Sequence, residues 1–358
     1  MRREKYPRTG RRNAATKAAS KNGGLVLAMY NGHLERMAEK RLVLFSGRGY
    51  PELAERIADR LDITLGDVYL TSFSGGEVYA RYEQSIRGSD VFIVQSLGEP
   101  VNQNLMELFV MIDAAKRASA ESIVAVIPWL AYSRQDRKTK PREPITARLV
   151  ASMLRVAGAT RVMTMDLHVG QIEGFFSTPV DHLTAMHTFV DHFAGQGFRN
   201  AEDAVVVAPD TGEVKVAKRL ADHLGLPWAI VNKLRRQHGQ SEVTHVIGEV
   251  AERRAILIDD IIDTGGTTVN AAESILDCGA MEVHAAATHA VFSGPAYERI
   301  EDSPIKEVVV TDTLPLKRDE PRNKIRVLGI APILAATIRN VFSEDSVSEV
   351  FMGENQLF

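Results

Sequence analysis

The chain has 358 residues, a formal net charge of −3 and 45% apolar residues. This length is typical of two domains, and the apolar fraction supports full cores and excludes a disordered chain. No stretch has the eighteen consecutive apolar residues of a membrane helix, and the near-neutral charge gives no argument for nucleic acid as a partner. The single cysteine, Cys278, excludes an internal disulfide, so we expect a soluble protein of the reducing cytoplasm.

The first residues differ from this average. Residues 1–22 hold eight Lys or Arg against one acid and few large apolar residues. We expect residues 1–36 to form a disordered basic arm outside the fold, with Met29 or Met37 as alternative true starts. The segment lacks the apolar region of a secretory signal. A transit peptide or a tail that binds polyanions stays a second hypothesis.

Strand and helix signals alternate from residue 41 onward. The apolar run 42–45 predicts a buried strand, and Gly and Pro turn signals follow it. An apolar face at i, i+4 spacing then predicts a helix that ends at Leu61. Later apolar runs predict further strands at 91–94, 122–127 and 161–165.

The same unit returns in the second half of the chain. A strand is predicted at 205–208, and the helix 217–224 matches 54–61 at five positions. The strands 91–94 and 122–127 correspond in the same way to 255–258 and 283–291. This alternation predicts a duplicated α/β domain, with mostly parallel sheets covered on both faces. We expect the halves to divide near residues 180–190 and ligands to bind at the carboxyl ends of the strands.

The strongest local signal follows the strand 255–258. Asp259 and Asp260 stand at its carboxyl end, and Asp263 precedes the run Thr-Gly-Gly-Thr-Thr at 264–268, which opens a predicted helix at 269–276. Two glycines allow a tight turn with inward-pointing amides, and the helix N-terminus favours a phosphate. The paired carboxylates can accept hydrogen bonds from a vicinal diol, directly or through a hydrated metal. The pattern therefore predicts a site for ribose 5-phosphate or a derivative.

Two alternatives bear on this interpretation. Asp-rich and Gly-rich turns can cap helices and bind nothing, although so long a combination disfavours that view. The loop has neither the Gly-Lys-Ser/Thr of a Walker motif nor the dinucleotide fingerprint. The corresponding segment of the first half, 95–101, has no carboxylate pair and no Gly-Gly. We therefore expect one such site per chain.

The loop resembles the signature of type I phosphoribosyltransferases and of the ribose-phosphate pyrophosphokinase (PRPP synthetase) family. Further segments are similar to the latter family, in its order and over roughly residues 40 to 351: they are 73–77, 104–108, 132–138, 166–172, 293–296 and 309–313. The resemblance implies two tandem type I phosphoribosyltransferase-like domains, each a mostly parallel sheet flanked by helices. We place these domains at 37–183 and 184–358.

The resemblance implies transfer of the β,γ-diphosphoryl group of ATP to the 1-hydroxyl of ribose 5-phosphate, giving PRPP and AMP. It also implies the ligand contacts. Ribose 5-phosphate would be bound by Asp259, Asp260, Asp263, Thr264, Gly265, Gly266 and Thr267. ATP would be bound by Phe73, Gly75, Gly76, Glu77, Arg134, Gln135, Asp136 and His168.

Charge accumulates at the β-phosphorus during this transfer, so fixed cations and Mg²⁺ are needed. By resemblance, Lys233 and Arg235 stabilise the transferring group from a polar stretch predicted to be a mobile loop after the strand 228–231. His168 and Asp210 are implied as contacts of Mg²⁺ or its water shell. Regions of phosphate or ADP regulation are implied at Ser85, Arg87, Ser293 and Gly294.

The resemblance also implies a homo-oligomer, expected to be a hexamer under allosteric control. One rival is a phosphoribosyltransferase, which shares the loop but needs no duplicated first domain. Another is a catalytically silent homologue that assembles with an active enzyme. Such a protein should show changes at Lys233, Arg235, His168 or the Asp259–Asp260 pair, and all are intact. A nucleic-acid-binding protein would depend on the basic arm alone.

Overall fold

The computed structural model describes residues 26–30, 33–37, 40–234, 243–317 and 319–348. The chain forms two compact units, Met1–Arg41 and Leu42–Phe358. The first unit contains an antiparallel hairpin of β1 (Val26–Tyr30) and β2 (His33–Met37). The arm predicted over residues 1–36 includes β1 and most of β2, whose backbone groups pair with each other, and its disorder stays a prediction. Residues 1–25, 31 and 32 of this arm lie outside the described residues.

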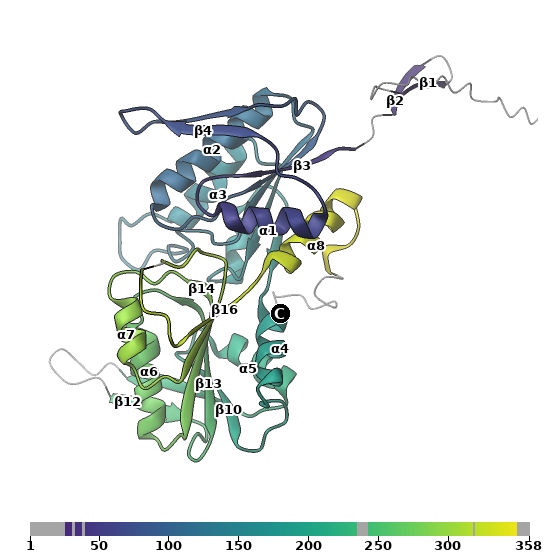
Figure 1. Cartoon of the computed structure of the whole chain (residues 1–358). Coiled ribbons are helices and arrows are strands. Elements are labelled where there is room, and N and C mark those ends of the chain that lie inside the picture. The colour runs from purple at the N-terminus through teal and green to yellow at the C-terminus, as the bar shows by residue number, and fades with distance from the viewer. Residues whose placement is uncertain (1–25, 31–32, 38–39, 235–242, 318, 349–358) are drawn as a thin grey trace, which may run out of the picture. The chain divides into compact units, whose positions relative to one another are not determined.

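The second unit, Leu42–Phe358, begins with a five-stranded parallel sheet in the order β3-β6-β7-β8-β9 (Figure 1). Its strands are β3 (Leu42–Ser46), β6 (Asp90–Val94), β7 (Ser122–Ile127), β8 (Arg161–Met165) and β9 (Val180–Leu183). A separate antiparallel hairpin is formed by β4 (Val68–Ser72) and β5 (Val78–Tyr82). The ring of Tyr82 packs against Phe45 of β3, with centroids 4.5 Å apart.

A second sheet has seven strands in the order β12-β11-β10-β13-β14-β15-β16. All neighbours are parallel except β12, which is antiparallel to β11. The strands are β10 (Ala204–Ala208), β11 (Trp228–Leu234), β12 (Val243–Ile247), β13 (Arg254–Ile262), β14 (Glu282–Ala290), β15 (Glu307–Thr311) and β16 (Ile325–Leu328).

Helices connect these strands. They are α1 (Pro51–Leu61), α2 (Val101–Arg117), α3 (Thr146–Ala157), a 3₁₀ helix (Gly170–Phe175), α4 (Met186–Gly195), α5 (Val214–Leu224), α6 (Gly266–Asp277), α7 (Ala296–Asp302) and α8 (Ala331–Ser343). Over the described part of the chain, none of them combines the length and hydrophobicity needed to cross a bilayer.

The burial of β13 shows why its sequence is an unbroken apolar run. Ala255 and Leu257 pack into a core beneath α6 and α7, whereas Ile256 and Ile258 pack into a core on the opposite face of the sheet. All four are buried because helices cover both faces, as expected for a parallel sheet. This strand ends at the carboxylates that the sequence singled out.

One core is shared by the two sheets. It contains Leu44 and Met163 of the first sheet together with Val206 and Ile256 of the second. The last helix, α8, contributes Leu334 to this core and packs beside α1, as Figure 1 shows. The two α/β domains are therefore joined by a continuous hydrophobic core, which limits their relative movement.

The predicted repeat is confirmed, because strand and helix recur in both halves at the expected places. The main difference concerns β11. The sequence predicted a strand over 228–231 followed by a loop, but β11 continues to Leu234. Lys233 pairs with Thr244 of β12, and this antiparallel ladder extends the strand beyond its apolar part.

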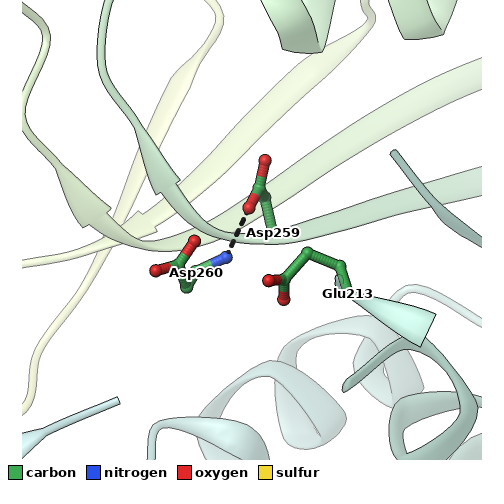
Figure 2. Close-up of side chains that lie close together, drawn as sticks. All are labelled: Glu213, Asp259 and Asp260. Carbon is green, nitrogen blue, oxygen red and sulfur yellow. Dashed lines mark hydrogen bonds between the residues drawn. The ribbon is translucent and has the colours of Figure 1, made fainter. Parts of the chain in front are cut away.

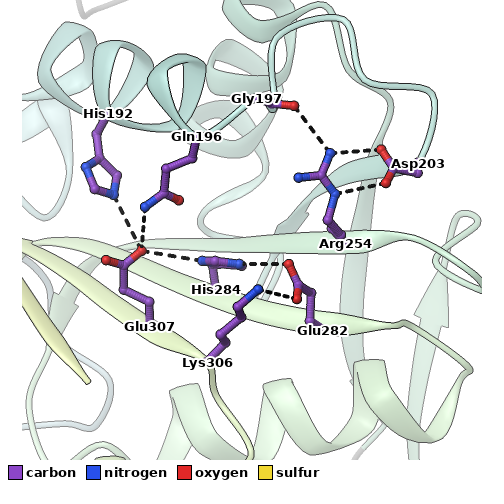
Figure 3. A network of polar contacts seen from close by, with 9 residues as sticks. All are labelled: His192, Gln196, Gly197, Asp203, Arg254, Glu282, His284, Lys306 and Glu307. Atoms are coloured by element: carbon purple, nitrogen blue, oxygen red, sulfur yellow. Dashed lines mark hydrogen bonds and ion pairs between the residues drawn. The ribbon is translucent and has the colours of Figure 1, made fainter. Parts of the chain in front are cut away.

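Charged side chains bind one another at the amino ends of β13, β14 and β15 (Figure 3). Lys306 lies 2.5 Å from Glu282 Oε2, and Arg254 binds both carboxylate oxygens of Asp203 at 2.9 and 3.0 Å. Glu307 accepts a hydrogen bond from Gln196 at 3.0 Å. Lys306 and Arg254 are thus paired with acidic residues of the same chain. We interpret this end of the sheet as a network of ion pairs that stabilises the fold.

A matched pair of methionines tests the shared core. Met163 is fully buried in β8, whereas Met281 is 55% exposed. Met163→Ala should lower the free energy of unfolding by about 2–5 kcal/mol because it removes buried surface and leaves a cavity. Met281→Ala should change it by no more than about 0.5 kcal/mol. Urea denaturation followed by circular dichroism measures both, and equal losses would contradict the assigned core.

Candidate active site

Three carboxylates meet at the carboxyl edge of the second sheet (Figure 2). Asp259 and Asp260 belong to the end of β13, and Glu213 is the residue that precedes α5. One oxygen from each lies within 4.8 Å of the others. The backbone amide of Asp260 donates to Asp259 Oδ1 at 2.8 Å. Such a group of oxygen donors is suited to a hard divalent cation.

Burial disfavours the ionised form of these carboxylates. Burial, followed by the negative charges of Asp260 and Asp210, raises the pKa of Glu213 to about 8. Burial and the charge of Asp260 also raise the pKa of Asp259 well above its ordinary value. Glu213 therefore favours its protonated form at neutral pH while no cation is bound, and the pKa of Asp259 is shifted in the same direction. A cation bound to these oxygens would reduce the repulsion between the neighbouring carboxylates.

His168 reaches this cluster from the first domain. It follows β8, and its Nδ1 donates to Asp260 Oδ2 at 2.8 Å. This hydrogen bond is the main cause of the raised pKa of His168, with the charge of Asp260 also contributing. Burial raises the pKa of Asp260, but the hydrogen bond to His168, the charge of His168 and the hydrogen bond with Asp259 together outweigh burial and hold this pKa below its ordinary value. The predicted site is thus assembled from both domains.

The predicted phosphate loop opens α6. Gly265 has φ +76° directly before the helix, a conformation in which a side chain is strained, and Gly266 is the first helical residue. Thr264 and Thr267 are exposed, so their hydroxyls face solvent. Together with the amides of the first helical turn, these groups can bind an anion.

Asp263 joins residues that were assigned to different ligands. Arg134 Nη1 lies 2.6 Å from Asp263 Oδ2, and the Ser293 hydroxyl donates to Asp263 Oδ1. Burial opposes the ionised form, but these two partners together hold the pKa of Asp263 below its ordinary value. The structure therefore brings one predicted ATP contact beside the loop predicted to bind ribose 5-phosphate.

Another set of predicted ATP contacts lies at the tip of the hairpin β4–β5. Phe73 is 56% exposed, and its amide donates to Glu77 O at 2.9 Å. Gly75 and Gly76 are open to solvent, since an added Cβ would meet no atom within 4 Å. Within the described residues, no hydrogen bond or ion pair joins this tip to the acidic cluster. The hairpin tip is therefore an exposed surface separate from the acidic cluster, and a ligand would have to bind to the tip itself.

The remaining predicted residues occupy several positions. Gln135 Oε1 accepts from the Thr146 hydroxyl at 2.5 Å, and the charge of Asp136 contributes to the raised pKa of His168. Asp210 accepts from the Gly212 amide at 2.7 Å, so its carboxylate closes the turn before Glu213. The predicted regulatory residues Ser85, Arg87 and Gly294 are exposed.

The predicted catalytic residues are only partly described. The backbone of Lys233 belongs to β11, which corrects its predicted place on a loop. Arg235 lies outside the described residues. The sequence also missed Glu213. A signal was present. Glu213 follows the turn at the carboxyl end of β10, Asp259 and Asp260 lie toward the carboxyl end of β13, and these two parallel strands are neighbours.

Comparisons with known proteins cover both domains. Residues 42–158 match the model of the N-terminal domain of ribose phosphate pyrophosphokinase. Residues 235–352 match the model of the phosphoribosyl synthetase-associated domain. The second match includes β13 with Asp259 and Asp260 and the loop after it, whereas Glu213 lies between the two matched ranges.

The similarity extends to whole proteins. The chain is 49% identical over 315 residues to a ribose-phosphate pyrophosphokinase of Clostridium acetobutylicum, covering 88% of this chain and 98% of the relative. It is 48% identical over 313 residues to one of Bacillus subtilis, covering 87% and 98%. A solved phosphoribosylpyrophosphate synthetase from Mycobacterium smegmatis has 45% identity and a TM-score of 0.81, covering 85% of this chain and 100% of that one.

The raised pKa values predict how stability depends on pH. Unfolded Glu213 loses its proton near its ordinary pKa of 4.5, whereas the folded protein without a cation keeps it to about 8. Between these values the folded state binds the extra proton. The free energy of unfolding should therefore fall as pH rises, by at most about 1.4 kcal/mol per pH unit for this group.

Urea denaturation in a chelator from pH 5 to 8 measures this slope. Glu213→Gln should flatten it, because the amide cannot titrate and occupies nearly the same volume. Exposed Glu298→Gln, in α7, serves as the control and should leave the slope unchanged. An identical slope in native protein and Glu213→Gln would contradict the proton on Glu213.

Proposed function

Because the chain belongs to the ribose-phosphate pyrophosphokinase family, we propose that it transfers the β,γ-diphosphoryl group of ATP to the 1-hydroxyl of ribose 5-phosphate. In this reaction the hydroxyl oxygen bonds to the β-phosphorus, the bond from that phosphorus to the oxygen of AMP breaks, and the hydroxyl proton leaves. The products are PRPP and AMP, and PRPP serves nucleotide biosynthesis.

Ribose 5-phosphate would bind along the segment from Asp259 to Thr267. The 5-phosphate would accept hydrogen bonds from the hydroxyls of Thr264 and Thr267 and from amides at the start of α6. Asp259 and Asp260 would accept bonds from the sugar hydroxyls, since an ionised carboxylate is a pure acceptor. Asp263, between these groups in the sequence, would complete the site.

ATP would approach from the first domain. Arg134 is adjacent to Asp263, and a guanidinium can bind two phosphate oxygens as a fork. Gln135, Asp136 and His168 would complete the phosphate end. The exposed hairpin tip with Phe73 and Glu77 would contact adenine of ATP bound to a neighbouring subunit, because it shares no described contact with the acidic cluster of its own chain.

Mg²⁺ fits the donors of the acidic cluster. Glu213, Asp259 and Asp260 supply only oxygen atoms, and hard Mg²⁺ prefers oxygen ligands and retained water. When bound, the ion would neutralise charge on the polyphosphate. Asp210 would act at its water shell, and His168 would orient Asp260. Lys233 and Arg235 would stabilise the transferring group by their positive charge.

The observation that carries this proposal is the meeting of His168 and Arg134 with Asp260 and Asp263. A phosphoribosyltransferase would use the loop after β13 without needing the first domain. Here the first domain supplies His168 as the partner of Asp260 and Arg134 as the partner of Asp263. The intact acidic cluster likewise favours catalysis over the silent homologue.

Turnover with ATP, ribose 5-phosphate and Mg²⁺ should yield AMP and PRPP in equal amounts. Asp263→Asn should lower kcat/KM for ribose 5-phosphate by about 10- to 100-fold, since it weakens charge-assisted hydrogen bonds worth about 1.5–3 kcal/mol. Asp277→Asn, at the exposed far end of α6, is the matched control and should retain native values.

Product analysis separates the rivals. Formation of ADP and phosphate without PRPP would contradict the proposed transfer. Binding of both substrates without turnover, at several phosphate concentrations, would favour the silent homologue. Production of a nucleotide and diphosphate from PRPP and a base would favour the phosphoribosyltransferase.

We also infer a cytoplasmic homo-oligomer, most simply the hexamer implied by the sequence resemblance, with allosteric control through the exposed residues Ser85 and Arg87. Its support is an apolar stripe on α3, where Leu149, Met153 and Val156 are 55%, 37% and 78% exposed at helical spacing. A monomer would leave this stripe in water.

Light scattering tests the assembly. Val156→Glu should reduce the mass of the native oligomer, because it places a charge in an apolar interface. Met281→Glu introduces the same charge at another exposed site and should leave the mass unchanged. A native monomer, or an unchanged mass in Val156→Glu, would contradict the assignment of the α3 stripe.

A further inference from the structure

The end of β8 is fastened to the end of β14 by three hydrogen bonds. The Thr288 hydroxyl donates to Asp166 Oδ2 at 2.7 Å. His289 Nε2 lies 3.1 Å from Met165 O and 3.0 Å from Asp166 O. Two consecutive residues of the second domain therefore bind both backbone and side chain of the first domain at one place.

The direction of the histidine bonds follows from its partners. Both groups near Nε2 are carbonyl oxygens, which only accept, so Nε2 carries a hydrogen and is shared between them. Nδ1 lies 3.0 Å from Thr313 Oγ1, and the Trp129 ring packs against the imidazole with centroids 4.6 Å apart. His289 is fully buried, and these contacts hold Nε2 as a donor to the two carbonyl oxygens.

Asp166 needs this support because of its backbone. Its φ is +32°, in a region that non-glycine residues rarely occupy. Its Oδ2 accepts from the Ala185 amide at 2.9 Å as well as from Thr288. Strained conformations persist where their surroundings hold them. The turn at Asp166 directs the chain so that His168, two residues later, reaches Asp260.

Thr288 and His289 belong to β14, and Asp260, which binds His168, belongs to the adjacent strand β13. In the ladder between β13 and β14, Ile261 is paired with His289 and Asp259 with Ala287. Asp260 and the Thr288–His289 pair are therefore fixed relative to each other by backbone hydrogen bonds. Any loosening of the Asp166 turn would change the distance from His168 to Asp260.

We propose that Thr288 and His289 are positioning residues, which hold the Asp166 turn so that His168 is set against Asp260 for the transfer reaction. They touch neither substrate and act through the first domain's backbone. The expected effect on turnover rests on the proposed function, whereas the structural role of Thr288 and His289 does not. Displacement of a catalytic group by about 1 Å can reduce turnover by about 100-fold, so partial loosening should be measurable.

Thr288→Val tests the proposal, because valine keeps the shape and lacks the hydroxyl. We expect kcat to fall about tenfold while KM for ribose 5-phosphate stays within about twofold, since the loop after β13 that would bind it remains in place. Thr288→Ser restores the donor and should recover most of the native kcat. Ser96→Ala is the control: it removes another bond between the domains, from Ser96 Oγ to Thr313 O at 2.5 Å, and should leave kcat unchanged.

Hydrogen–deuterium exchange of the full-length protein gives a readout without substrate. Amides of the segment 166–170 should exchange about tenfold faster in Thr288→Val than in the native protein, Thr288→Ser or Ser96→Ala. Because this measurement needs no turnover, it separates failure of the positioning role from failure of the proposed function. Native exchange in this segment of Thr288→Val, or a loss of kcat equal to that of Ser96→Ala, would overturn the proposal.

Discussion

Two adjacent carboxylates at the end of a buried strand are the constraint on which the site depends. Asp259 and Asp260 both lie in the carboxyl-terminal part of β13, where helices on each face of the sheet exclude water. Like charges in such a place repel strongly, so they need protons, a hydrogen-bond donor or a cation. The structure supplies the donor as His168 and shifts the pKa of Asp259 and Glu213 upward. The first domain thus stabilises a negative charge of the second domain through the hydrogen bond from His168 to Asp260.

Duplication explains how one domain could take on this supporting role. In the first domain, Gln95 follows β6 at the position that corresponds to Asp259, and its amide is turned inward. Gln95 Oε1 accepts from the Gly49 amide at 2.9 Å, and Gln95 Nε2 donates to Glu107 Oε1 at 3.0 Å. A Cβ on Gly47 would lie only 2.3 Å from Gln95 Oε1, so this side chain fills the space against the backbone. The first domain therefore binds its own side chains where the second has an open acidic cluster.

The sequence predicted the features that depend on neighbouring residues. Four apolar residues before Asp259 identified a strand buried on both faces, and Gly265 identified the turn into α6. It could not reveal Glu213 as a member of the cluster, because the order of β10 beside β13 is a tertiary fact. It ended β11 too early for a similar reason, since the antiparallel partner β12 extends that strand. The contacts of Thr288 and His289 join segments over 120 positions apart, and no local pattern encodes them.

The hydrogen bonds that Thr288 and His289 make to the first domain involve no ion pair, whereas Arg134 and Asp263 form one at the candidate site. His289 and Thr288 are buried, and their partners are carbonyl oxygens or a carboxylate with two donors. A charged pair there would have to overcome a desolvation cost of several kcal/mol per ion. At the edge of the sheet, Arg134 and Asp263 keep partial exposure, so in the proposed function each would exchange the other for a substrate group. Buried hydrogen bonds thus hold the two domains together beside a partly exposed ion pair.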